Sequence, residues 1–194
     1  MPESCPAQRH YGLSDRLQAM VRADSWRMDA LMTARRLQLP DWAIGAGFLR
    51  SLVWDAAHGF ENPTPLGDID LLFFDSEDTS LDREQRLEAE LAQFQPGLPW
   101  EVRNQARMHK RKGNPPYENT ADALRYWLET ATCVAMRLED DDGMTVIAPF
   151  GLEDLFTLRS RPTPAGLKEA ASYRERMERK NWPGIWPKVV VETL

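Results

Sequence analysis

The chain has 194 residues with a formal net charge of −6; 42% are apolar and 28% charged, which is ordinary globular usage. The acidic balance argues against general binding to DNA, because such binding depends on Lys and Arg neutralising phosphates. No apolar run approaches the roughly 18 residues of a membrane span, and residues 1–11 contain no signal-like segment, so we expect a soluble, cytoplasmic protein.

The first half of the chain predicts helices and two short strands. Residues 14–40 show apolar residues at helical spacing, with Ser14 as a cap and an interruption around residues 24–25. Residues 43–44 form a strand that runs through a glycine turn at residues 45–47 into a helix ending near Gly59. The apolar run at residues 68–74 is a buried strand with acids only at its start.

The second half continues with alternating helices and strands. The expected elements are an amphipathic helix at 81–94, a strand from 100, a polar and basic stretch at 103–112 that runs into a loop, a helix at 120–127, a hairpin at 132–149, a short helix at 151–156 and a charged helix at 166–180. We expect one domain over residues 1–194, with a core at about 14–119 and a C-terminal extension at about 120–194.

Asp68 and Asp70 are the strongest candidates for chemistry. Residues at i and i+2 on a strand point to the same face, so the two carboxylates lie side by side. They repel each other unless a cation is present, and Mg²⁺ (or Mn²⁺) is the natural partner because it takes oxygen ligands. The alternative is that Asp68 is a turn residue and Asp70 a solvated residue at a strand start.

Two further features extend this pattern to phosphoryl transfer. The turn Gly45-Ala46-Gly47 opens a helix whose free backbone amides favour phosphate, although glycines often serve only as turn formers. Glu101 stands between two apolar residues, where a charge is costly unless it faces a cleft; the alternative is a surface glutamate on an edge strand. Together these are the parts of a two-metal site. Phosphatases of the haloacid dehalogenase type and many sugar transferases are disfavoured, because their apolar strand precedes the acids.

Basic and aromatic residues permit two interpretations each. Arg103 and Arg107 begin the densest basic cluster, which can hold a phosphate or form a solvated loop; the others are His109, Lys110, Arg111 and Lys112. Arg50 either faces the cleft or pairs with a neighbouring acid.

The tryptophans are expected in the core, with Trp182 and Trp186 packing the tail onto the domain. Cys5 and Cys133 form neither a disulfide framework nor a closed metal site.

The strings at residues 45–50, 68–71 and 100–109 resemble the bacterial nucleotidyltransferase-like family of the polymerase β superfamily, as do residues 129–132 and 148–156. The resemblance covers about residues 39–186. It implies that Asp68 and Asp70 bind the metals, that Glu101 completes the triad, and that Gly45 and Gly47 approach the nucleotide phosphates. Many superfamily members carry a Gly-Ser pair where this chain has Ala46 and Gly47, so the turn hydroxyl is missing.

These observations predict an α/β (α+β) fold with a small mixed sheet flanked by helices. The predicted function is metal-dependent transfer of a nucleotidyl group from an NTP to an unidentified acceptor, which is a small molecule, RNA or protein. Asp68, Asp70 and Glu101 are the predicted catalytic metal ligands, and the predicted nucleotide-binding residues are Gly45, Ala46, Gly47, Arg50, Arg103 and Arg107. The alternatives are a non-catalytic nucleotide or phosphometabolite-binding protein, and an interaction protein whose exposed Trp-Pro tail docks a partner.

Overall fold

The computed structural model describes residues 12–194, so the expectations for residues 1–11, including Cys5, lie outside the described part. No helix within it is long and apolar enough to cross a membrane. Its helices are α1 (Leu13–Arg22), α2 (Ser25–Arg36), α3 (Gly47–His58), α4 (Leu81–Phe94), α5 (Gln105–Lys112), α6 (Thr120–Leu124), η1 (Thr130–Thr132), α7 (Glu153–Phe156), α8 (Pro164–Lys168), α9 (Ala170–Lys180) and α10 (Trp182–Ile185).

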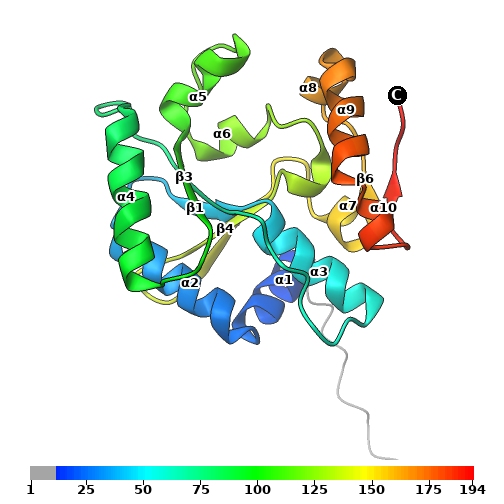
Figure 1. Cartoon of the computed structure of the whole chain (residues 1–194), viewed down its shortest axis with the longest axis horizontal. Coiled ribbons are helices and arrows are strands. Elements are labelled where there is room, and N and C mark those ends of the chain that lie inside the picture. Colours follow the sequence, from blue (N-terminus) through cyan, green and yellow to red (C-terminus); the bar gives the residue numbers. More distant parts are fainter. Residues whose placement is uncertain (1–11) are drawn as a thin grey trace, which may run out of the picture.

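A mixed five-stranded sheet in the order β3-β2-β1-β4-β5 forms the centre of the fold (Figure 1). Its strands are β1 (Ala43–Gly45), β2 (Ile69–Phe73), β3 (Trp100–Asn104), β4 (Ala135–Leu138) and β5 (Met144–Ile147). Within this sheet β2 and β3 pair in parallel, and the other neighbouring strands are antiparallel. A smaller parallel pair joins β6 (Arg159–Ser160) to β7 (Val190–Val191). The predicted mixed sheet flanked by helices is confirmed.

The sheet takes two of its strands from beyond residue 120. The predicted hairpin forms β4 and β5, and β4 pairs directly with β1 through Ile44 and Met136. The segment that the sequence assigned to an extension therefore completes the central sheet. Helices α8 to α10 of this segment lie opposite α5 in Figure 1.

The two N-terminal helices begin where local capping permits. The predicted interruption is present, because the Asp24 side chain accepts a hydrogen bond from the Arg27 amide at 3.2 Å and starts α2. Ser14 does not cap α1, which instead begins at Leu13 after Gly12. The core beneath them contains Leu17, Leu31 and Phe48.

Residues 105–112 form a helix that the sequence did not predict. The Asn104 side chain accepts from the Ala106 amide at 3.1 Å and caps α5, and Gly113 ends the helix in the left-handed conformation. The segment has no apolar stripe, so hydrophobic periodicity gives no helical signal. The loop expected after this basic stretch is present at residues 113–116, but the alternative of a solvated loop is wrong for residues 105–112.

The C-terminal tryptophans are inside the protein. Trp182 and Trp186 are each 1% exposed, and their rings meet Trp54 edge to face at 5.3 and 5.2 Å. The prediction that they pack the tail onto the domain is confirmed. An exposed Trp-Pro docking tail is excluded for these two residues.

Asp55 links three separate parts of the chain. This buried α3 residue accepts hydrogen bonds from the Thr64 amide at 2.8 Å and the Thr64 hydroxyl at 2.6 Å. It also accepts from Trp186 Nε1 at 2.7 Å. The loop that leads to Asp68 and the C-terminal segment are therefore both fastened to one carboxylate.

We expect Asp55→Asn to lower the free energy of unfolding by about 1–3 kcal/mol, because an amide in place of one oxygen leaves a buried donor without an acceptor. Urea denaturation measures the change. Asp29→Asn, at an exposed site on α2, is the control and should change stability by less than about 0.5 kcal/mol. Equal stabilities for the two variants would show that Asp55 does not link these segments.

Candidate active site

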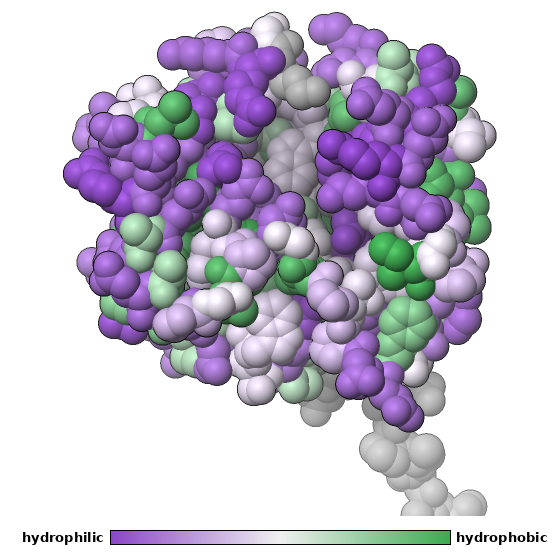
Figure 2. All heavy atoms as spheres, in the orientation of Figure 1, coloured by the Kyte–Doolittle hydropathy of each residue, from purple (hydrophilic) through white to green (hydrophobic). Residues whose placement is uncertain are grey.

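A cavity of about 600 Å³ opens between the sheet and the helices on both sides of it. Residues of α3, β2, β3, α5, α9 and α10 line it, together with the loop before Asp68 and the segment after α6. Figure 2 shows the hollow between hydrophilic side chains over α5 on one side and over α8 and α9 on the other. The volume suits a small-molecule ligand.

Strand register brings the three predicted acids together. Asp70 lies directly opposite Glu101 in the parallel pair of β2 and β3, and Asp68 immediately precedes β2. All three side chains line the cavity. Burial, together with the neighbouring charges of Asp68 and Glu101, raises the pKa of Asp70 to about 7. The predicted convergence of the acids is present in the structure.

The three acids differ in their partners. Glu101 forms an ion pair with Arg103, whereas no ion pair involves Asp68 or Asp70 among residues 12–194. Within the same residues, no group of three or more histidine, cysteine or acidic side chains is arranged to enclose a metal ion. The unpaired carboxylates of Asp68 and Asp70 nevertheless fit a hard divalent cation that takes its other ligands from water and phosphate.

The two arginines predicted to bind phosphate are engaged by acids. Arg103 lines the cavity, but its guanidinium pairs with Glu101 and, at 2.8 Å, with Glu88. Arg107 is not among the cavity-lining residues and forms a two-point ion pair with the buried Glu84, with Nε to Oε1 at 2.7 Å. The structure therefore gives Arg107 a role in fastening α5 to α4. The Lys112 side chain lies outside the described part.

The turn before α3 has a different geometry from the predicted one. The positive φ falls on Ala46 (φ 53°, ψ −120°) rather than on either glycine. Ala46 and Gly47 line the cavity, but Gly45 does not. A Cβ at Gly45 would lie 3.1 Å from the Val134 carbonyl oxygen, so sheet packing explains this glycine. The start of α3, whose first amides have no partner within the helix, is the part of the turn that faces the cavity.

Arg50 lies in the cavity without a partner. No hydrogen bond or ion pair involves it among residues 12–194, and its buried Nε is unsatisfied. Burial lowers the pKa of Arg50 to about 10, so the side chain stays charged at neutral pH. Of the two predicted alternatives, the structure shows the side chain facing the cleft.

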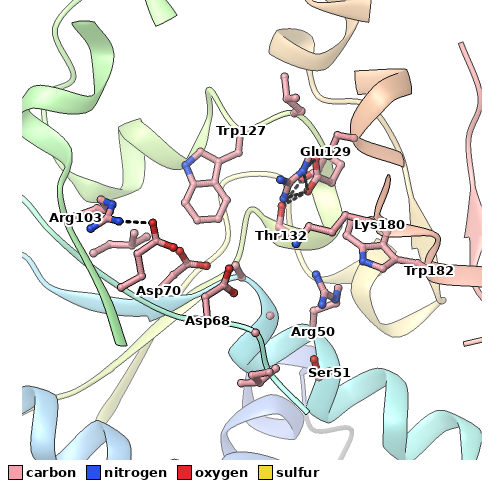
Figure 3. Close-up of a pocket in the computed structure, with 18 of the residues that line it drawn as sticks. Arg50, Ser51, Asp68, Asp70, Arg103, Trp127, Glu129, Thr132, Lys180 and Trp182 are labelled. Carbon is pink, nitrogen blue, oxygen red and sulfur yellow. Dashed lines mark hydrogen bonds and ion pairs between the residues drawn. The ribbon is translucent and has the colours of Figure 1, made fainter. Parts of the chain in front are cut away.

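Several cavity residues were not singled out from the sequence. They are Ser51, Trp127, Glu129, Thr132, Arg176 and Lys180, and Figure 3 shows most of them around the space above Asp68 and Asp70. Glu129 is fully buried and accepts from Arg176 Nε at 2.9 Å through both oxygens. Residues 129–132 did contribute to the family resemblance, but no spacing rule relates them to the acids far upstream.

Residues 32–191 match the model of a protein family described as nucleotidyltransferase. The chain belongs to this family. A solved structure described as a CCA-adding enzyme head domain shares 29% identity with this nucleotidyltransferase, at a TM-score of 0.80 over 91% of this chain and 96% of that one. The polymerase β-type nucleotidyltransferase fold predicted from the sequence is therefore confirmed.

Two other solved structures match less closely. A CCA-adding enzyme in complex with CTP is 18% identical, with a TM-score of 0.47 over 80% of this chain and 38% of that one. A tRNA-processing enzyme complex is 20% identical, with a TM-score of 0.44 over 69% of this chain and 35% of that one. No curated protein matches this nucleotidyltransferase significantly.

We expect the metal-free protein to lose stability as the pH rises from about 4 to about 7. The pKa of Asp70 is about 7 in the folded protein and 3.8 as its ordinary value, so the folded state alone holds the proton in this window. Above pH 7 the loss is complete and amounts to roughly 2–4 kcal/mol. Denaturation in EDTA between pH 4 and pH 8 measures it.

Asp70→Asn should remove this pH dependence, since the amide does not titrate. Asp140→Asn, at an exposed site in the β4–β5 turn, is the control and should keep it. An unchanged pH profile in Asp70→Asn would mean that Asp70 is ionised throughout the window and that burial does not perturb it.

Proposed function

We propose that this protein transfers a nucleotidyl group from an NTP to an acceptor in a reaction that depends on Mg²⁺ or Mn²⁺. The observation that carries the proposal is the register of β2 and β3, which faces Asp70 toward Glu101 with Asp68 beside them in a nucleotidyltransferase fold. Repulsion among these groups is relieved by a bound divalent cation.

Asp68 and Asp70 would hold the metal ions, and Glu101 would complete the set. Bound there, the ions would neutralise the carboxylates and the phosphate charge and favour ionisation of the attacking hydroxyl. Glu101 Oε1 is engaged by Arg103, so Oε2 is the oxygen available to accept the proton of the acceptor hydroxyl. The ion pair with Arg103 also fixes the orientation of the Glu101 carboxylate.

The start of α3 would bind the phosphates of the donor. Gly47 leaves open space there, because a Cβ at this position would meet only Arg50 Nη2 at 3.6 Å and Leu66 at 3.7 Å. The first amides of the helix and its dipole favour an anion. Because the similar head domain is described as part of a CCA-adding enzyme, CTP and ATP are the first donors to test.

The missing turn hydroxyl favours a second candidate function. Ala46 and Gly47 offer only backbone groups to a phosphate, so the protein would bind a nucleotide or phosphometabolite without transferring it. Turnover separates the two functions. Each labelled NTP is incubated with Mg²⁺ or Mn²⁺ and a cell extract, and label is then sought in small molecules, RNA and protein; nucleotide binding without any transfer would favour the second function.

We expect Mg²⁺ or Mn²⁺ to raise the melting temperature by about 5 °C or more at a hundred times its Kd, because it binds only the folded state. Asp70→Asn should be as stable as the metal-free wild type or more so, while its response to metal largely disappears. Differential scanning fluorimetry measures both effects. Glu101→Gln and Asp68→Asn should also lose the response, and Asp140→Asn should keep it. A metal response preserved in all three cavity variants would contradict the proposed site.

A further inference from the structure

The cavity has two ends of opposite charge. At one end, Asp68 and Asp70 carry no ion pair, and Glu101 is neutralised by Arg103. At the other end lie Arg50 and Lys180, neither of which has an ion pair among residues 12–194. Figure 3 shows Asp70 and Asp68 on one side of the space and Arg50 with Lys180 on the other. A ligand that carries a cation at one end and negative charge at the other matches this distribution.

Arg50 is held in an aromatic cage. Its guanidinium carbon lies 5.4, 4.8 and 5.3 Å from the ring centres of Trp54, Trp182 and Trp186. The residue is only 9% exposed, and rings contribute attraction without satisfying its N–H donors. Arg27 also stacks on a tryptophan, but it donates from Nε to the Phe48 carbonyl at 2.8 Å. Arg27 also pairs with Asp24 and keeps only Nη2 unpaired, whereas Arg50 lines the cavity and makes no hydrogen bond or ion pair among residues 12–194.

The residues around Arg50 come from both ends of the fold. Ser51, the next residue on α3, is fully buried, lines the cavity, and has a hydroxyl without a partner. Two cations of α9 line the cavity: Arg176 is paired with Glu129, whereas Lys180 has no ion pair among residues 12–194. The helices α9 and α10 thus supply the second cation and two walls of the cage.

We propose that Arg50 and Lys180 bind the terminal phosphates of the donor nucleotide, so that the C-terminal helices α9 and α10 complete the donor site. The identity of the ligand as a donor rests on the proposed function. Metal-bound phosphate at Asp68 and Asp70 and free phosphate oxygens at Arg50 and Lys180 satisfy both ends of the cavity. The site then selects triphosphates over monophosphates, because a short phosphate tail cannot reach both ends.

Titration calorimetry with inorganic tripolyphosphate tests the site without base, acceptor or turnover. It is carried out in EDTA on Asp70→Asn, which retains Arg50 and Lys180 but lacks one of the acids. Arg50→Met and Lys180→Met in this background should each weaken binding about tenfold or more, the loss expected for a charged hydrogen bond. Arg111→Met, which removes a cavity-lining cation on α5, is the matched control and should change affinity less than about threefold.

Melting temperatures and a competition experiment decide whether a loss of binding reflects the proposed phosphate site. Arg50→Met should melt within a few degrees of its parent, because the guanidinium has no hydrogen-bond or ion-pair partner to lose and methionine still packs against the tryptophan rings; if it does not fold, Lys180→Met alone decides. Equal affinity in parent and variants would overturn the site. A non-hydrolysable NTP should displace tripolyphosphate, whereas simultaneous binding of both would overturn the donor assignment. Binding through Arg50 and Lys180 in a protein that transfers no label would refute the proposed function and leave the anion site standing.

Discussion

The parallel register of β2 and β3 is the constraint on which the rest of the site depends. It fixes Asp70 beside Glu101 and requires the chain to cross back between the two strands through α4. The same helix then satisfies the outer edge of β3, since Glu88 accepts from the Val102 amide at 2.9 Å and Glu84 from the Asn104 amide at 2.7 Å. The crossover thus protects the edge strand while it sets the geometry of the acids.

Several residues that line the cavity have arrangements that lower the stability of the folded protein. Asp70 is partly buried next to two like charges, Arg50 is buried without an ion pair, and Ala46 has a backbone conformation that favours glycine. Elsewhere the buried charges are paired, as in the Glu84–Arg107 and Glu129–Arg176 contacts. Departures from local stability rules that gather in one cavity are expected where a ligand supplies the missing partners.

Local sequence patterns predicted the scaffold better than the contacts within the site. Strand β2 and helices α3 and α4 follow from apolar periodicity and turn residues, and alternation on a strand places Asp68 beside Asp70. The catalytic and binding roles of these residues remain predictions. Helix α5 was missed because its sequence has no apolar stripe. The pairing of Arg107 with Glu84 and the position of Lys180 depend on tertiary packing, which spacing along the chain does not encode.

The three hydrogen bonds of Asp55 have a consequence for biosynthesis. Trp186 is one of the donors, and residues of α9 and α10 line one end of the cavity. Asp68 and Asp70 are therefore synthesised long before the residues that close the cavity around them. A chain that folds as it is made, from the N-terminus onward, has no enclosed cavity until α10 docks. An enclosed cavity is in this sense available only to a chain that has been synthesised beyond Trp186.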